Sequence, residues 1–197
     1  MKKIILLIAF SLICTAGYSQ KKKKGAKKTA ATPTALAKID NLTAELIRNN
    51  FYIFVNNKPK KDTLVVKSFE GKKSPADVKI VPFASKGTPL YAISWTEVTV
   101  TETKLKTETA TVIMTQIWDV VSKTKVLDNS QTTTNIKEIV FLSNTQASET
   151  REKVRREGFE FTLLPEGDVL LKNKTQENKM TYDATLKKFV NIPVKKK

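Results

Sequence analysis

The strongest structural signal in the chain is residues 90–121, LYAISWTEVTVTETKLKTETATVIMTQIWDVV, which contain neither glycine nor proline. Threonine, valine and isoleucine dominate this segment, and β-branched residues favour strands over helices. Apolar side chains recur at every second position on both sides of residues 104–106, Lys-Leu-Lys, which is the pattern of two paired strands. We therefore expect an antiparallel sheet built on two long strands.

The apolar positions of the first long strand shift partway along it. They begin at Tyr91, Ile93 and Trp95 and continue at Val98 and Val100. This change of phase predicts either a β-bulge or a switch of the apolar side chains to the other face of the sheet.

The two tryptophans of the long strands are candidate anchors of the core. Trp95 and Trp118 are predicted to be buried in it. The alternative hypothesis is a small β-barrel in which Trp95, Met114 and Trp118 line an interior that holds an apolar ligand.

Short strands separated by turn residues are predicted on both sides of this hairpin. They are FYIFVNN (51–57), TLVVKSF (63–69), VKIVPFA (78–84), FEFTLL, VLLKN, KMTYD and KKFVNI. Strands at this spacing favour an antiparallel meander that curls into a barrel or packs as a sandwich. The predicted fold class is therefore mainly β, of the α+β kind, because two helices are also expected.

The first expected helix opens the domain at about residues 34–50. Leu36, Ile39, Leu42 and Leu46 recur at three- to four-residue spacing, which forms one apolar stripe on a helix. The second is a short polar surface helix at residues 148–158, with oppositely charged residues four apart and Gly158 at its end.

Residues 1–19 have the composition of a secretory signal peptide. Lys2 and Lys3 precede the apolar stretch 4–13, and small residues lead to a cleavage site before Gln20. A lipoprotein anchored at Cys14 and an uncleaved membrane anchor are the alternatives. Bulky residues directly before Cys14 disfavour the first, and the short apolar run disfavours the second. We expect an exported protein, periplasmic or extracellular, without a transmembrane segment after the signal is removed.

Six lysines follow the leader within residues 20–33, a segment predicted to be a disordered linker. They are Lys21, Lys22, Lys23, Lys24, Lys27 and Lys28. They could attach the protein to an anionic lipid or glycan surface, or serve only as a solvated linker. Residues 34–192 are expected to form one domain, followed by a basic tail at 193–197.

The net charge of +16 is mainly terminal. Lys2 and Lys3, the six linker lysines and the last three lysines carry eleven of these charges, which leaves five for residues 32–194. The folded domain is therefore only mildly basic, and we do not expect a nucleic-acid partner. Lysines also recur in turns, as in VNNKPKKDTLVV, WDVVSKTKVL and YDATLKKFV, and would form a basic rim for an anion if these turns met at one end.

The composition removes several kinds of chemistry. The chain has no histidine, and Cys14 is its one cysteine, so a histidine-based triad, a disulfide and a cysteine-bound metal are not expected. Its six glycines form neither a dinucleotide fingerprint nor a phosphate-binding loop. We predict no metal and no cofactor.

Carboxylate pairs are the remaining catalytic candidates. Glu157 with Glu160, and Glu166 with Asp168, could serve an envelope-glycan hydrolase. The leading hypothesis is instead a non-enzymatic, β-rich envelope protein that binds a partner, such as an envelope protein, or supports an assembly.

Overall fold

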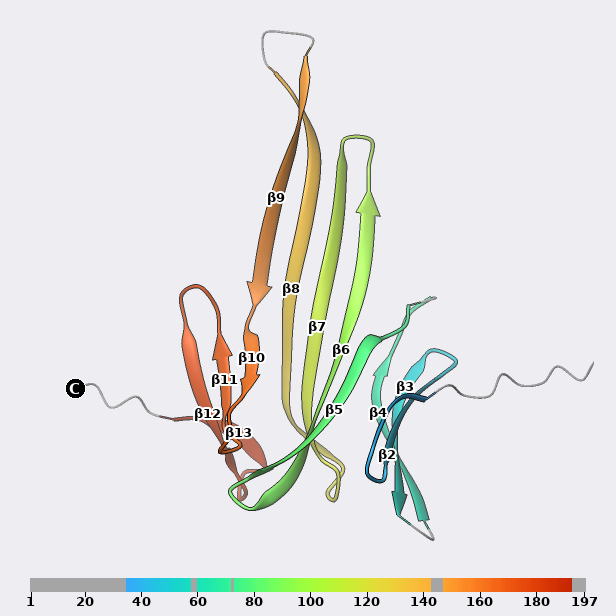
Figure 1. The fold of residues 1–197 in the computed structure, drawn as a ribbon, viewed down its shortest axis with the longest axis vertical. Coiled ribbons are helices and arrows are strands. Elements are labelled where there is room, and N and C mark those ends of the chain that lie inside the picture. Colours follow the sequence, from blue (N-terminus) through green and yellow to red (C-terminus); the bar gives the residue numbers. More distant parts are fainter. Residues whose placement is uncertain (1–34, 58–59, 72, 143–146, 193–197) are drawn as a thin grey trace, which may run out of the picture. The chain divides into compact units, whose positions relative to one another are not determined.

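The computed structural model describes residues 35–57, 60–71, 73–142 and 147–192. Within these ranges the chain forms thirteen strands and no helix (Figure 1). The strands make three antiparallel sheets, so the prediction of a mainly β fold is confirmed. None of the three sheets closes into a barrel, and the helices expected at 34–50 and 148–158 are not formed.

Each sheet is a meander in which consecutive strands are neighbours. Sheet A contains β1 (Ala35–Ile39), β2 (Leu42–Ile47), β3 (Asn50–Asn57) and β4 (Lys60–Ser68). Sheet B contains β5 (Ala76–Ser85), β6 (Thr88–Glu102), β7 (Lys106–Asp119), β8 (Thr124–Phe141) and β9 (Ser148–Gly158). Sheet C contains β10 (Glu160–Leu163), β11 (Val169–Lys172), β12 (Glu177–Asp183) and β13 (Lys188–Asn191).

The long hairpin predicted at residues 90–121 is confirmed as β6 and β7. The two strands pair without a bulge from Tyr91, opposite Trp118, to Glu102, opposite Thr107. The shift of apolar positions along β6 is therefore a switch of face. Side chains of a strand alternate between faces, so Val98 and Val100 lie on the face opposite to that of Trp95.

The prediction of an N-terminal helix is wrong because its apolar residues also fit two short strands. Asp40 takes a left-handed conformation with φ of 48°, and the chain turns so that Ile39 pairs with Leu42. Leu42 and Ala44 then point to the same face and are fully buried. The two-residue turn separates Ile39 from Leu42 by three positions, and this spacing happens to match that of an apolar stripe on a helix.

The prediction of a polar helix at 148–158 is also wrong, since these residues form β9. Residues four apart share a face in a strand as well as in a helix, so the charge spacing did not distinguish the two. Pairing with β8 stabilises the strand. It places Lys137 directly opposite Glu152 and brings Lys153 within ion-pair distance of Glu138. All eleven residues of β9 are exposed.

Sheet B has a hydrophobic core on each of its faces. On one side, Ile93, Trp95 and Trp118 pack with the buried residues of sheet A. On the other side, Leu90 and Ile117 pack with residues of sheet C. We call these sides the A face and the C face of sheet B.

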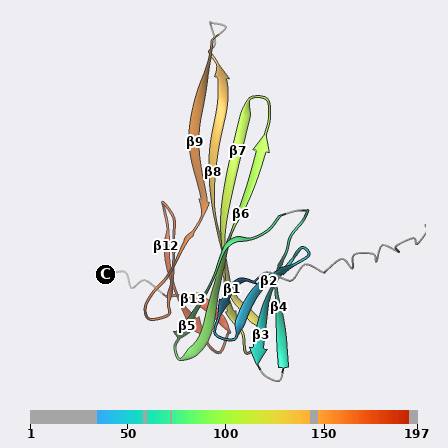
Figure 2. The ribbon, with the colours of Figure 1, turned by 45° about the vertical axis from the view of Figure 1, so that its right-hand side comes forward.

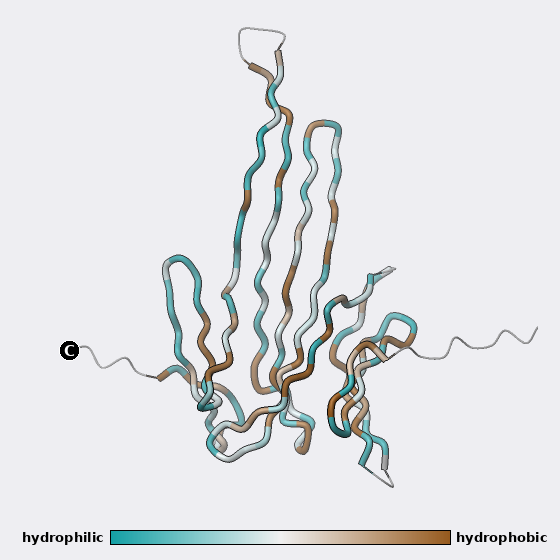
Figure 3. Tube along the Cα trace, viewed as in Figure 1, coloured by the Kyte–Doolittle hydropathy of each residue, from teal (hydrophilic) through white to brown (hydrophobic). Residues whose placement is uncertain are grey.

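Both cores contact the same end of sheet B, which we call its inner half. The outer half consists of residues 97–102 of β6, 106–113 of β7, 131–141 of β8 and 148–158 of β9. It extends beyond the other sheets (Figures 1 and 2). Apolar residues concentrate in the inner half, whereas β9 is largely hydrophilic (Figure 3). Apart from its end nearest the other sheets, where Glu97 pairs with Lys67 of sheet A and Gln131 lies beside the β11–β12 turn of sheet C, the outer half is a single layer with two uncovered faces.

The turn between β7 and β8 is held by one carboxylate. Asp119 accepts hydrogen bonds from the N–H groups of Val121 (3.0 Å) and Ser122 (3.1 Å) and from the Ser122 hydroxyl (2.6 Å). Burial raises the pKa of Asp119, but these hydrogen bonds and the nearby Lys187 together outweigh it, so the pKa lies below its ordinary value.

We expect Asp119→Ala to lower the free energy of unfolding by about 1–3 kcal/mol at pH 7, because it leaves these donors without their acceptor. The folded-state pKa is lowered, so the stabilisation by the carboxylate is complete above the ordinary pKa of about 3.9 and is lost as the pH falls through the folded-state value. Urea unfolding at pH 7 and pH 3 checks this. The difference between wild type and variant should shrink at pH 3, and an equal difference at both pH values would contradict it.

Candidate functional site

The three predicted ligand-lining residues lie in the core between sheets A and B. Trp95 is 1% exposed, and its ring packs edge-on against Phe51 with 5.4 Å between the ring centroids. Its indole N–H donates to Glu97 (2.8 Å), and that of Trp118 donates to Gln116 (3.0 Å). Met114 lies opposite Trp95 and packs against the same core. These side chains fill the space between two open sheets.

The predicted anion-binding lysines, Lys21 to Lys28, lie outside the described residues, and their role stays a prediction. The same holds for the leader at 1–19 and for the basic tail at 193–197. Within the described ranges, no helix could cross a membrane, and no cluster of three or more acidic, histidine or cysteine side chains could hold a metal ion.

One pair of candidate catalytic carboxylates is held by a lysine. Lys179 Nζ lies 2.8 Å from Glu166 Oε1 and 3.3 Å from Asp168 Oδ2. The hydrogen bond from Lys179 is the main cause that lowers the pKa of Glu166. A general acid in a glycosidase needs a raised pKa, so this environment suits a structural ion pair better than proton donation.

Several lysines at the turns of the expected basic rim have acidic neighbours in the part of the chain that the structure describes. Lys187, in the β12–β13 turn, contributes to the lowered pKa of Asp119 beside the β7–β8 turn. The pKa of Asp183 is lowered mainly by the backbone N–H groups of Leu186 and Thr185, with a smaller contribution from Lys86. In the β7–β8 turn itself, Lys123 pairs with Asp62 at 2.8 Å. These lysines therefore have acidic neighbours, and we do not treat the rim as the site.

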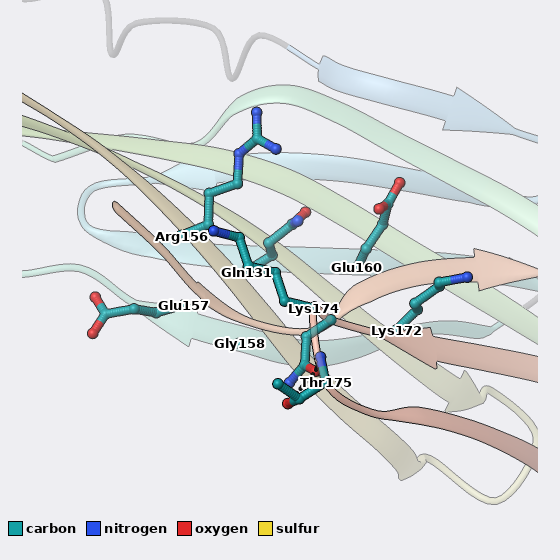
Figure 4. A pocket seen from close by; sticks show the side chains of 9 residues that line it. Gln131, Arg156, Glu157, Gly158, Glu160, Lys172, Lys174 and Thr175 are labelled. Atoms are coloured by element: carbon teal, nitrogen blue, oxygen red, sulfur yellow. Dashed lines mark hydrogen bonds between the residues drawn. The ribbon is translucent and has the colours of Figure 1, made fainter. Parts of the chain in front are cut away.

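The other pair, Glu157 and Glu160, lines a hollow where β9 leads into β10 (Figure 4). The hollow has a volume of about 530 Å³ and lies between the strands β8 and β9 and the turn that joins β11 to β12. Its lining residues are Gln131, Arg156, Glu157, Gly158, Glu160, Lys172, Asn173, Lys174 and Thr175. Apart from Gly158, every one of them has a polar or charged side chain.

Two local features shape the hollow. Gly158 has a φ of +83°, and a Cβ atom there would lie 2.2 Å from the backbone oxygen of Ser130, so only glycine allows the close approach of the two strands. In the β11–β12 turn, the Asn173 side-chain oxygen accepts hydrogen bonds from the N–H groups of Thr175 (2.9 Å) and Gln176 (2.8 Å). This Asx-type turn fixes the backbone beside the hollow.

The charges of the hollow are only partly paired. Lys172 lies 3.0 Å from Glu177, and Glu157 lies 3.2 Å from Arg155 on the A face. Neither Arg156 nor Lys174 forms an ion pair with a described carboxylate within 4.0 Å. Arg156, Gln131 and Glu160 extend to the same side of the strands, whereas Glu157 points away from them (Figure 4).

The two faces of the outer half of sheet B differ in charge. The A face carries ion pairs between Lys106 and Glu108, Glu149 and Arg151, Glu138 and Lys153, and Arg155 and Glu157. Strand pairing places rows of mostly uncharged residues on the C face: Thr96, Ile113 and Gln131; Val98, Thr111, Thr133 and Arg156; and Val100, Thr109, Asn135 and Val154. The next row, Glu102, Thr107, Lys137 and Glu152, brings in both charge signs.

The C face also has a second hollow farther out along β8 and β9. Its volume is about 400 Å³, and residues such as Thr109, Asn135, Lys137 and Val154 line it. Val98, Val100, Ile113 and Val154 are 45–62% exposed. The C face thus combines exposed apolar groups with threonine and amide side chains, which is typical of a contact surface.

No protein-family model matches the chain, and the comparisons with curated proteins and with solved structures found no significant match. The alternation in residues 90–121 predicted both faces of β6 and β7. The hollow, in contrast, is formed by residues more than 40 positions apart, and no short stretch of sequence indicates it.

Proposed function

We propose that the chain is an exported, non-enzymatic, β-rich protein of a bacterial envelope that binds an envelope protein or supports an assembly. The observation that carries this proposal is the outer half of sheet B, a single layer whose C face is uncovered and exposes Val98, Val100, Ile113 and Val154. Strand pairing places Thr109, Thr111 and Thr133 among these residues. Exposed apolar groups on a regular hydrogen-bonded surface favour protein binding.

The charge distribution indicates what kind of partner this face would accept. The C face of the outer half bears Glu102, Glu152, Lys137 and Arg156, so its positive and negative charges balance. The A face concentrates the remaining ion pairs, which are costly to desolvate. We therefore place the contact on the C face and expect a partner whose own contact surface carries little net charge.

Two further parts of the proposal come from the N-terminal sequence. Removal of residues 1–19 would leave a chain without cysteine, which suits an envelope compartment. The lysines at 21–28 would add a weak attraction to anionic lipid or glycan, of about 1 kcal/mol for each lysine near an anionic membrane. This attraction would concentrate the protein at a surface, and the C face would provide the specific contact.

A photo-crosslinking amino acid placed on each face tests the proposal in cells that make the protein. Val98 and Val100 point from the C face, and Thr99 and Thr101 are matched controls on the same exposed strand but on the A face. We expect a discrete protein adduct in the envelope fraction from positions 98 and 100, at least about fivefold stronger than from positions 99 and 101. Equal adducts from both faces, or none from either, would contradict the proposed contact.

A further inference from the structure

We propose that the hollow beside Gly158 binds one carboxylate-bearing sugar unit, such as a uronic acid residue of an acidic glycan, through Arg156 and Lys174. This inference extends the proposed envelope role. The hollow lies at the β9 edge of the C face, beside sheet C, whereas the crosslinking positions Val98 and Val100 lie on β6, with β7 and β8 in between.

The net charge of the residues that line the hollow suits a ligand with one negative charge. Among the lining charges that are not paired with a residue outside the hollow, Arg156 and Lys174 supply two cations and Glu160 supplies one carboxylate, so one positive charge remains. Because Lys172 and Glu157 are each engaged by another residue, the free cations are Arg156 and Lys174. A planar guanidinium binds a carboxylate through two parallel hydrogen bonds, which makes Arg156 the main recognition group.

The other lining groups indicate a ligand rich in hydroxyl groups. Gln131 and Asn173 offer amide groups, Thr175 offers a hydroxyl, and Glu160 can only accept hydrogen bonds when ionised. No aromatic or aliphatic residue lines the hollow, and its apolar surface comes from the stems of polar side chains, which can pack against the C–H groups of a sugar ring. A ligand with one acidic group and several hydroxyl groups satisfies these donors and acceptors together.

Glu160 also helps to distinguish between anions. A carboxylate at the edge of the hollow repels a doubly charged phosphate more strongly than a singly charged uronate, and it can accept a hydrogen bond from a sugar hydroxyl. The volume of about 530 Å³ lies within the range of small-molecule sites. The Asx-type turn at Asn173 holds one wall in place before the ligand binds, which lowers the entropic cost of binding.

Binding to the purified full chain tests the inference, with trigalacturonate as the probe. Neutral maltotriose and inorganic phosphate serve as comparison ligands. Isothermal titration gives the affinity, and amide chemical shifts locate the site. We expect trigalacturonate to shift the amide signals of Arg156, Gly158 and Thr175, with at least about tenfold weaker binding of both comparison ligands.

Two neighbouring arginines provide the matched variants. Arg156→Gln removes the guanidinium group of the hollow. Arg155→Gln removes the same charge from the adjacent residue on the A face, where it frees Glu157 but leaves Arg156, Lys174 and the linker lysines in place. We expect R156Q to weaken trigalacturonate binding about tenfold and R155Q less than about twofold. Circular dichroism should show that both variants, which alter exposed residues of an edge strand, remain folded.

Several outcomes would overturn the inference. They are equal loss of binding in R155Q and R156Q, equal affinity for maltotriose, a preference for phosphate, or no measurable binding. None of them affects the crosslinking result at Val98 and Val100. Conversely, a failed crosslinking experiment leaves the glycan site intact, so the two proposals fail separately.

Discussion

Gly167→Ala is expected to be among the most destabilising single substitutions in this protein, at about 2–5 kcal/mol. Gly167 lies in the turn between β10 and β11 with φ of +83°, and its N–H donates to Leu164 O at 2.9 Å. A Cβ atom there would lie 2.1 Å from the backbone oxygen of Ala84 in β5. The turn of sheet C packs so closely on β5 that the backbone of one must move away.

The expected loss has two components that a matched control separates. A left-handed conformation costs an alanine about 1–2 kcal/mol, and the steric overlap adds about 1–3 kcal/mol. Gly87 has a similar φ of +80°, but nothing lies within 4 Å of the place of its Cβ atom. Gly87→Ala should therefore show the conformational component alone. Denaturant unfolding of both variants measures the difference, and equal losses would show that the contact with Ala84 is not tight.

Trp95→Ala is expected to lower the free energy of unfolding by about 3–5 kcal/mol. Trp95 is 1% exposed and contacts Phe51 of sheet A from its position in sheet B, so its removal leaves a cavity where the two sheets meet. The substitution also removes the indole donor to Glu97, which then keeps only Lys67, 2.5 Å away. Both effects weaken the attachment of sheet A.

Urea unfolding followed by circular dichroism measures this effect, with Trp118 as the remaining fluorescent probe. Trp95→Phe keeps an aromatic ring and removes the hydrogen bond, so we expect a smaller loss of about 1–3 kcal/mol. Val121→Ala is the control for an apolar residue that does not contribute to the core, since Val121 is 85% exposed, and its effect should stay within about 0.5 kcal/mol. A loss below about 1 kcal/mol for Trp95→Ala would show that Trp95 does not anchor the two sheets.

The most regular part of the chain was also the easiest to predict. Alternation over residues 90–121 predicted β6 and β7. The shift from Trp95 to Val98 predicted a bulge or a change of face, and the pairing of β6 with β7 shows the change of face. The expected burial of Trp95 and Trp118 agrees with their place in the core between sheets A and B. Local sequence was enough for these features because strand geometry relates each position to a face.

The two helix predictions failed where local patterns had two solutions. Leu36, Ile39, Leu42 and Leu46 fit one helical stripe, but a turn at Asp40 also divides them between two strands. The charges of 148–158 fit a helix and an edge strand equally well. Pairing with distant strands resolved both cases, and such pairing cannot be read from a short window of sequence.

The candidate site could not be predicted for a related reason. Arg156 and Gly158 were assigned to the end of a polar helix, and Glu157 and Glu160 were considered only as a carboxylate pair. The hollow exists because the turn at Asn173–Thr175 comes to lie beside β8 and β9. The segments that line the hollow contain no recognisable binding motif, and only their proximity in the folded chain makes them a site.

By itself, the amino-acid sequence determined an antiparallel β fold, the alternating faces of its longest strands, and the lack of histidine and of the usual nucleotide-binding motifs. These depend on residue type and on a period of two along the strand. Only the tertiary structure decided that the β strands divide into three open sheets, that sheets A and C cover one half of sheet B, and that the other half stays bare. Those outcomes depend on which apolar faces meet, and this is a property of the whole folded chain.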